Sequence, residues 1–157
     1  MAHSLIQVTP TITAGAYTAN KQVGGIMVLT GVSEGGFGGC YLRQLTITDK
    51  AKQSAAITVL FFDQLPVVSS SDNVACNVSA AELAAKGVGT ISMPTANYAV
   101  MSATSLGSQA GLNGVFLRPS PLGTANTIYA VAFTTGTPTY ASTSDLTFKF
   151  HFTWDYA

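Results

Sequence analysis

Apolar and polar residues alternate along the C-terminal part of the chain. Apolar side chains occupy every second position from Leu146 to Tyr156, and Thr, Lys, His and Asp stand between them. A period of two puts the two sets on opposite faces of a β-strand, whereas a helix would scatter the aromatic rings around its circumference. We therefore predict a strand over residues 146–156 whose apolar face, including Phe150 and Trp154, packs on a core.

Shorter segments of strand character recur throughout the chain. They are alternating or continuous apolar runs, bounded by Gly, Pro, Asn, Asp or Ser. The predicted strands cover residues 5–9, 25–30, 41–48, 56–62, 90–93, 98–102, 114–117 and 127–134. With the C-terminal strand, this set of short strands is typical of a β-sandwich or β-barrel. The length of 157 residues suits one domain with one core, and no stretch resembles a linker.

The segments between these strands are rich in turn-forming residues. The glycine run at positions 35–39, interrupted by Phe37, predicts a mobile loop. Residues 48–53 indicate a polar hairpin connection, and residues 69–73 form a turn cluster. Two prolines and a glycine within residues 119–123 interrupt the chain before the strand expected at 127–134.

One short helix is predicted. Ser79 is a good N-cap and Glu82 follows three residues later, which gives the capping-box pattern Ser-x-x-Glu. Val78 and Leu83 stand at the positions of a hydrophobic staple, and Gly87 supplies the stop. The pattern predicts a helix over residues 80–86 that is too short to be stable alone, and we expect it to plug one end of the sandwich.

Charge is scarce along the whole chain. Charged residues make up 9% of the sequence, against roughly 25% in ordinary soluble domains. The seven basic and seven acidic side chains cancel to a formal net charge of zero. So few charges give little electrostatic protection against association, which favours a subunit of an assembly. Only Lys50 and Lys52 lie close together, after Asp49, and the lack of a basic stripe argues against nucleic-acid binding.

The lack of targeting signals and the two cysteines both point to a protein made in a reducing cytoplasm. No segment reaches the roughly 18 consecutive apolar residues of a membrane span. Residues 1–4 lack the basic and apolar regions of a signal peptide, so we expect synthesis in a cytoplasm. Cys40 and Cys76 are the two cysteines, and we expect reduced, partly buried thiols rather than a disulfide.

Few side chains offer chemistry. His3 lies in a segment that we expect to be frayed, and His151 lies on the polar face of the C-terminal strand, without a His/Cys cluster at metal-ligand spacing. Asp49, Asp72 and Asp145 stand in turn-like contexts where Asp bonds its own backbone. A calcium site built from loop aspartates is an open alternative. We expect no enzyme, and predict no catalytic, cofactor-binding or metal-ligating residue.

The sequence argues against a phosphate-binding loop and against a carbohydrate-binding platform. The glycines at 35–39 lack the Gly-Lys-Ser/Thr of a phosphate loop and lead into a strand instead of a helix. A carbohydrate platform needs exposed aromatic rings, and Trp154, the single tryptophan, lies on the face expected to be core.

Part of the chain resembles a known class of proteins. Residues 45–53 and 56–63 form a strand, a turn and a strand, and are followed by Asp72-Asn73 and the helix start at 79–83. This order, together with residues 136–146, resembles small virion structural proteins of tailed bacteriophages, namely capsid decoration or cement proteins. The resemblance covers under half of the chain and supplies no motif for functional residues.

The resemblance implies a fold, a binding partner and a location on the virion. We expect an all-β protein, a single jelly-roll-like antiparallel β-sandwich over residues 1–157 with one short helix at about 80–86. It implies a decoration protein, made in the host bacterial cytoplasm, that binds the major capsid protein on the virion and stabilises the shell. Such proteins commonly form homo-oligomers at symmetry axes, a trimer being favoured over a dimer. A tail, neck or fibre component and a glycan-binding β-sandwich module are the alternatives.

Overall fold

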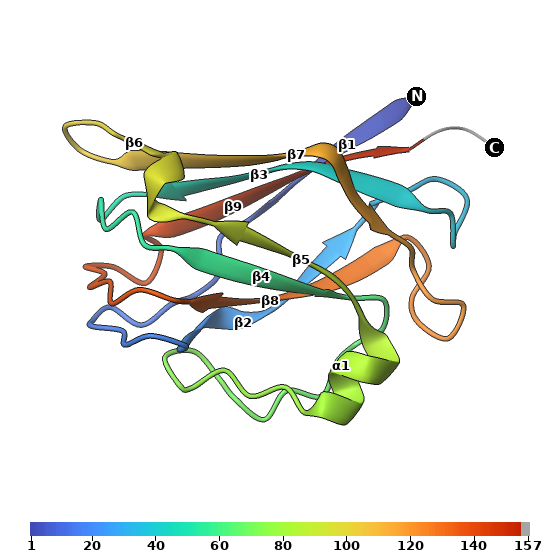
Figure 1. Ribbon diagram of the computed structural model, residues 1–157, viewed down its shortest axis with the longest axis horizontal. Helices are drawn as coiled ribbons and strands as arrows, with labels where there is room; N and C mark the ends of the chain where they lie inside the picture. The colour runs from blue at the N-terminus through green and yellow to red at the C-terminus, as the bar shows by residue number, and fades with distance from the viewer. Residues whose placement is uncertain (155–157) are drawn as a thin grey trace.

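The protein is an antiparallel β-sandwich (Figure 1). The computed structural model describes residues 1–154, except the side chains of residues 111–113. One sheet has five strands in the order β1-β9-β3-β7-β6, and the other has four in the order β2-β8-β4-β5. The elements are β1 Ala2–Val8, β2 Gln22–Thr30, β3 Cys40–Asp49, β4 Ile57–Phe62, α1 Ala80–Lys86, β5 Gly87–Met93, the 3-10 helix η1 Thr95–Asn97, β6 Tyr98–Val100, β7 Ser105–Leu117, β8 Thr127–Thr134 and β9 Leu146–Trp154.

The predicted C-terminal strand is confirmed as β9, and it supplies one wall of the core. Leu146, Phe148, Phe150 and Phe152 are fully buried, and the residues between them point outward. Phe150 meets Phe61 of the opposite sheet edge to face, with ring centroids 6.1 Å apart. The part of the prediction that concerns Asp155 and Tyr156 lies outside the described residues.

The strand expected at residues 114–117 is much longer in the structure, where β7 covers Ser105–Leu117. Its first half is rich in Gly, Ser and Gln and has no apolar alternation, so local sequence gave no strand signal. Pairing with β3, from Asp49↔Ser105 to Cys40↔Leu117, makes this segment a strand, with a register shift between Leu42 and Gln44. Tertiary pairing therefore overrides weak local propensity here.

The prediction of a hairpin at residues 48–53 is wrong. The segment joins β3 of one sheet to β4 of the other, so it forms a corner between the sheets. The buried carboxylate of Asp49 organises this corner by accepting hydrogen bonds from the backbone N–H groups of Ala51 (2.9 Å) and Ser54 (2.8 Å). Polar turn residues mark a change of direction, but they do not specify which sheet the next strand joins.

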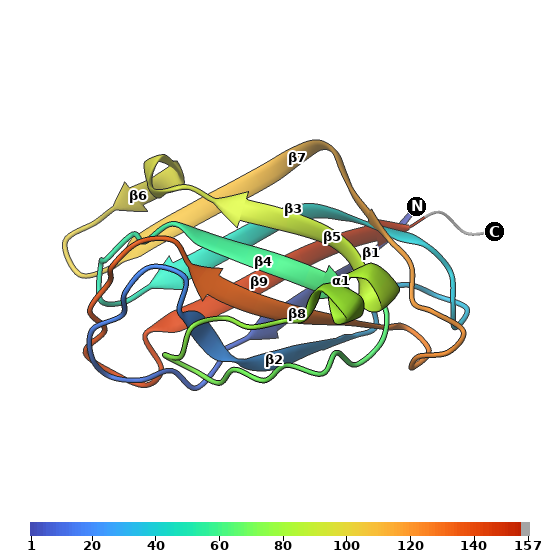
Figure 2. The same cartoon turned by 60° about the horizontal axis from the view of Figure 1, so that its bottom comes forward.

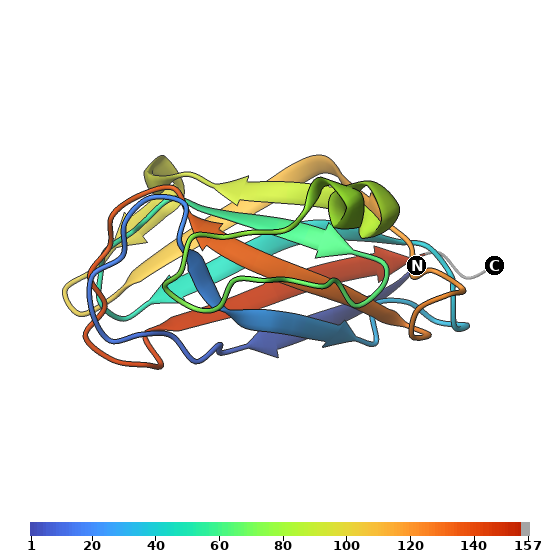
Figure 3. The same ribbon diagram turned by 90° about the horizontal axis from the view of Figure 1, so that it is seen from below.

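The four-stranded sheet is covered on both sides. Its inner face belongs to the main core, and Phe62, Tyr129 and Val131 form a second cluster on its outer face. Val68 and Cys76, from the segment that joins β4 to α1, pack against this second cluster. Figure 3 shows that segment crossing over β8 and β2. The chain therefore covers the outer face of the four-stranded sheet, whereas no described segment covers the outer face of the five-stranded sheet.

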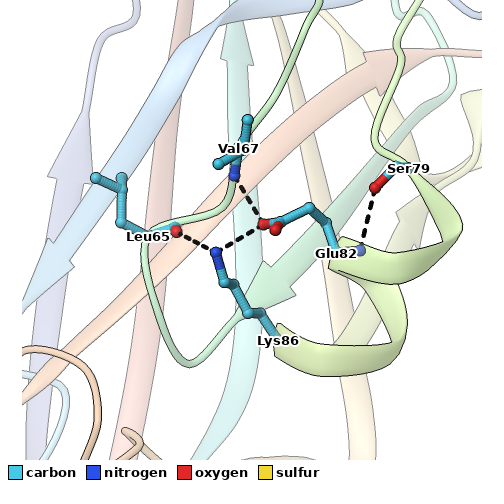
Figure 4. Close-up of polar contacts among 5 residues, drawn as sticks. All are labelled: Leu65, Val67, Ser79, Glu82 and Lys86. Carbon is cyan, nitrogen blue, oxygen red and sulfur yellow. Dashed lines mark hydrogen bonds and ion pairs between the residues drawn. The ribbon is translucent and has the colours of Figure 1, made fainter.

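Helix α1 has the predicted bounds, and Ser79 caps it by accepting a hydrogen bond from the Glu82 N–H at 3.2 Å. The Glu82 side chain does not complete a capping box. It accepts from the Val67 N–H at 2.8 Å and pairs with Lys86 at 2.8 Å, and Lys86 also donates to the Leu65 carbonyl at 3.1 Å (Figure 4). The contacts of Lys86 and of the Val67 N–H hold the pKa of Glu82 below its usual range.

The expectation that this helix plugs one end of the sandwich is wrong. None of its residues is buried, and Figure 2 shows it on the surface beside the start of β5. The reason is the small size of its apolar side chains, because four alanines and Leu83 supply too little surface to displace the strand side chains. The helix instead fixes residues 65–67 of the covering segment through Glu82 and Lys86.

We expect Ser79→Ala to lower the free energy of unfolding by about 0.5–1 kcal/mol, because the Glu82 N–H loses its acceptor. The effect should fall at the low end for an N-cap since the helix lies at the surface. Ser71→Ala, at another exposed serine of the covering segment, is the matched control. Urea unfolding of both variants measures the difference, and equal costs would contradict a specific capping role.

Candidate functional site

The outer face of the five-stranded sheet consists of the side chains of β1, β9, β3 and β7 that point away from the core. The strand register arranges them in rows. One row runs Leu5, His151, Gln44 and Ala110, and the next runs Gln7, Lys149, Thr46 and Ser108. Leu5 is 63% exposed and Leu106 is 40% exposed on this face. In Figure 1 no described segment of the chain crosses this outer face, in contrast to the outer face of the four-stranded sheet.

A hollow of about 510 Å³ lies on this face. Its lining combines apolar, cationic and neutral polar groups, namely His3, Leu5, Gln44, Thr46, Leu106, Lys149 and His151. The rings of His3 and His151 meet edge to face with centroids 6.1 Å apart. Within the described residues Lys149 has no ion pair, since the salt bridge found there joins Lys86 to Glu82.

His3 is a site residue whose position the sequence did not reveal. The expectation of a frayed segment is wrong, because Ala2–Val8 pairs with β9 along its whole length, with His3 opposite Thr153. The signal was present as an alternation of exposed His3, Leu5 and Gln7 with half-buried Ser4 and Ile6. The strand predicted at residues 5–9 covers the second half of β1, whereas its first residues, including His3 and Ser4, are too polar to extend that prediction.

An aromatic and cationic group borders the hollow at one end of the outer face. The rings of Tyr41 and Phe116 lie 5.2 Å apart, and the Arg43 guanidinium stands 4.9 Å from the centre of the Tyr41 ring. Arg43 Nε also donates to the Thr153 hydroxyl at 2.8 Å. Phe116 is 54% exposed. These contacts hold an arginine and two aromatic rings in fixed positions at the surface.

A second hollow of about 420 Å³ lies beyond Phe116, and Asp63, Arg118 and Pro119 are among its lining residues. Burial raises the pKa of Asp63, and one of its carboxylate oxygens is buried without a hydrogen-bond partner among the described residues. Arg118 Nε donates to the carbonyl of Phe37. The described lining of this hollow includes one carboxylate, one guanidinium and the hydroxyl of Ser120.

The other aspartates have structural roles. Asp145 accepts from the N–H groups of Ala141 and Ser142 at 2.8 Å each, so it bonds nearby backbone as predicted, as Asp49 does. The prediction fails for Asp72, whose carboxylate accepts from Thr13, Tyr17 and Gly24 at 2.6–2.8 Å. Asp72 therefore joins the covering segment to two distant parts of the chain.

The glycine run forms a loop between β2 and β3, as predicted, and leads into a strand. Asn126 holds it from both sides, because its side-chain oxygen accepts from the Gly36 N–H at 3.1 Å and its own N–H donates to the Gly36 carbonyl at 2.6 Å. Gly36 has a φ of +83°, a left-handed conformation that glycine adopts without a Cβ penalty. The glycines therefore allow the backbone to make this turn.

The thiols agree with the sequence expectation. Cys40 is buried and Cys76 is half-buried, and both are free. Burial raises the pKa of Cys40 to about 12 and also raises that of Cys76. Low thiolate content makes neither cysteine suited to nucleophilic chemistry. Across residues 1–154, no three His, Cys, Asp or Glu side chains are grouped in a way that could hold a metal ion.

Comparison with models of known protein families gives no match, and neither does comparison with curated protein sequences. Among the described residues, no helix has both the length and the apolar character needed to cross a membrane. The outer face, with its hollow and its aromatic and cationic border, is therefore the candidate functional site on the strength of its geometry.

Proposed function

We propose that this protein is a virion structural protein, a capsid decoration protein that binds the major capsid protein on the outside of the shell and stabilises it. The observation that carries the proposal is the difference between the two outer faces of the sandwich. The four-stranded sheet is covered by its own chain, whereas the five-stranded sheet leaves a broad face open. A protein that works through contacts alone needs such a face and no catalytic group.

The strand order supports a jelly-roll winding. Consecutive long strands lie in opposite sheets, as β1 and β2, β3 and β4, and β8 and β9 do. The order β1-β9-β3-β7 opposite β2-β8-β4-β5 follows from a chain folded as one long hairpin and wrapped around a core, with β6 added at the edge. Viral capsid and lectin domains are among the proteins that use the jelly roll. The fold is therefore compatible with the proposal.

The composition of the open face supports a protein partner. Interface cores are enriched in Tyr, Phe and Arg, and these are the residue types of the Tyr41, Phe116 and Arg43 group. Large apolar side chains are also exposed elsewhere, including Val67 at 70% and Leu122 at 85%. With a formal net charge of zero, these surfaces have little electrostatic protection against association.

A homo-oligomer is part of the proposal, and the resemblance favours a trimer over a dimer. Strand β1 is at the edge of its sheet and pairs with β9 on one side only. It carries neither proline nor Lys, Arg, Asp or Glu, so it lacks the usual protection of an exposed edge. A neighbouring subunit that covers this edge would satisfy its backbone groups.

Two measurements test the proposal. We expect the purified protein to sediment with several times the 16.2 kDa mass of one chain, three times for a trimer, and to co-sediment with undecorated capsid shells. The decorated shells should resist heat or chaotrope better than bare ones, because separating capsid subunits must then also break the added contacts. A strict monomer without affinity for the shell would contradict the proposal.

A glycan-binding module is the second candidate, and the exposed ring of Phe116 is the observation that favours it. The Tyr41 and Phe116 rings are tilted by 60° to each other and do not form the flat platform that stacks on a sugar face. Trp154 is half-buried against the core, as the sequence predicts. Screening against bacterial surface polysaccharides separates the two candidates.

A further inference from the structure

We propose that the hollow on the outer face binds carboxylate side chains of an acidic polypeptide segment of a partner protein. The inference concerns the chemistry of the contact, and it rests on the proposed function only for the identity of the partner. Lys149 is the cation among the described residues that line the hollow, and His3 and His151 add two imidazole rings.

None of the described carboxylates lines this hollow. The two acids at the ends of β3 and β9, Asp49 and Asp145, are buried and accept from nearby backbone N–H groups. Glu82 pairs with Lys86 on the far side of the sandwich, and Asp72 of the covering segment accepts from Thr13, Tyr17 and Gly24. Among its described lining residues the hollow therefore holds one cation, Lys149, and no carboxylate. Such a site attracts an acidic partner.

The lining of the hollow is suited to a carboxylate. The Lys149 ammonium, the Gln44 amide and the Thr46 hydroxyl can donate hydrogen bonds, and each histidine donates at least one N–H in either protonation state. Leu5 and Leu106 add apolar surface beside these donors, which can contact the aliphatic part of an acidic side chain. Lys149 is half-buried, so part of its hydration is already lost before a ligand arrives.

The geometry favours an extended polypeptide over other occupants. The hollow spans four strands and reaches β1, whose free edge offers unpaired N–H and C=O groups to an added strand. A second copy placed face to face would present the same hollow, whose described lining residues include a cation and no carboxylate. Nucleic acid requires neutralisation of several phosphates in a row, and this face carries only two formal cations among the described residues.

A peptide titration tests the inference without any capsid shell. The probe is a short, dye-labelled peptide of alternating glutamate and threonine with blocked ends, and the control peptide has glutamine in place of glutamate. We expect the glutamate peptide to bind, as measured by fluorescence anisotropy, and binding to weaken as salt is added. Equal binding of the two peptides, or no binding of either at low salt, would overturn the inference.

Matched variants locate the site. Lys149→Gln should weaken binding of the glutamate peptide by about threefold to tenfold, whereas Lys50→Gln, which removes the same charge from an exposed turn, should change it by less than about twofold. Thermal melting checks that both variants fold. Equal effects of the two variants would show general electrostatic attraction and overturn the assignment of the site.

Two other outcomes separate this inference from the proposed function. Binding of an oligogalacturonate in place of the peptide would overturn the polypeptide ligand and favour the glycan-binding module. If the peptide binds at the hollow but the protein does not bind capsid shells, the carboxylate-binding site is supported and the decoration role is contradicted. If shells bind but Lys149→Gln binds them as tightly as the unmodified protein, the decoration role stands and this site fails.

Discussion

Phe150→Asp is expected to unfold the protein at room temperature. Phe150 is fully buried between Phe148 and Phe152 on β9 and meets Phe61 across the sandwich. The substitution removes these ring contacts and places a carboxyl group in apolar surroundings. Loss of a buried Phe side chain alone costs about 3–5 kcal/mol, and burial of an unpaired polar group adds to this. The sum is comparable with the whole stability of an ordinary domain, about 5–15 kcal/mol.

The single tryptophan reports the result. Trp154 is half-buried at the end of β9, so its fluorescence should shift towards that of solvent-exposed indole when the sheet is lost. Thr147→Asp introduces the same side chain on the opposite face of the same strand, and it should cost less than about 1 kcal/mol. If the two variants are equally stable, the assignment of the two faces of β9 is wrong.

Asp72→Ala should have the second largest effect, a loss of about 3 kcal/mol in the free energy of unfolding. The Asp72 carboxylate accepts from the N–H and hydroxyl of Thr13, the hydroxyl of Tyr17 and the N–H of Gly24. Tyr17 is buried, so its hydroxyl would be left without this acceptor. Burial raises the pKa of Tyr17, as does its hydrogen bond to Asp72, so the hydroxyl stays protonated and acts as a donor.

Three variants distinguish the network from a general loss of charge. Tyr17→Phe removes one donor and should cost about 1 kcal/mol, less than Asp72→Ala. Glu34→Ala removes an exposed carboxylate and should change stability by less than about 0.5 kcal/mol. Urea unfolding measures all three, and a cost for Asp72→Ala no larger than that for Glu34→Ala would show that the network adds nothing.

Local pattern was sufficient for most of the fold. The alternation of β9, the apolar run of β8 and the cap of α1 each act within a few residues, so their positions follow from the sequence. The first half of β7 and the corner at Asp49 depend on distant partners, and they were missed or misassigned. Local signals predict elements well, but they do not encode which strands become neighbours.

The candidate site depends even more on strand neighbours that the local sequence does not encode. The alternation places Lys149 and His151 on the polar face of the last strand, as observed. Their neighbours His3, Gln44 and Leu106 come from three other strands and meet them because of the order β1-β9-β3-β7. A surface assembled from four distant segments of the chain leaves no motif in the sequence, and only the sheet order brings it together.

The position of β9 between β1 and β3 governs when each sheet can form during synthesis. All four strands of the smaller sheet have been made once the ribosome passes Thr134. The first strand to be synthesised, β1, has no partner until Leu146–Trp154 emerges. At about 5–20 residues per second, β1 waits on the order of ten seconds with both of its edges unpaired. Nascent chains are thus exposed to mispairing at β1 during this interval, and cellular chaperones that hold β1 would protect it until β9 emerges.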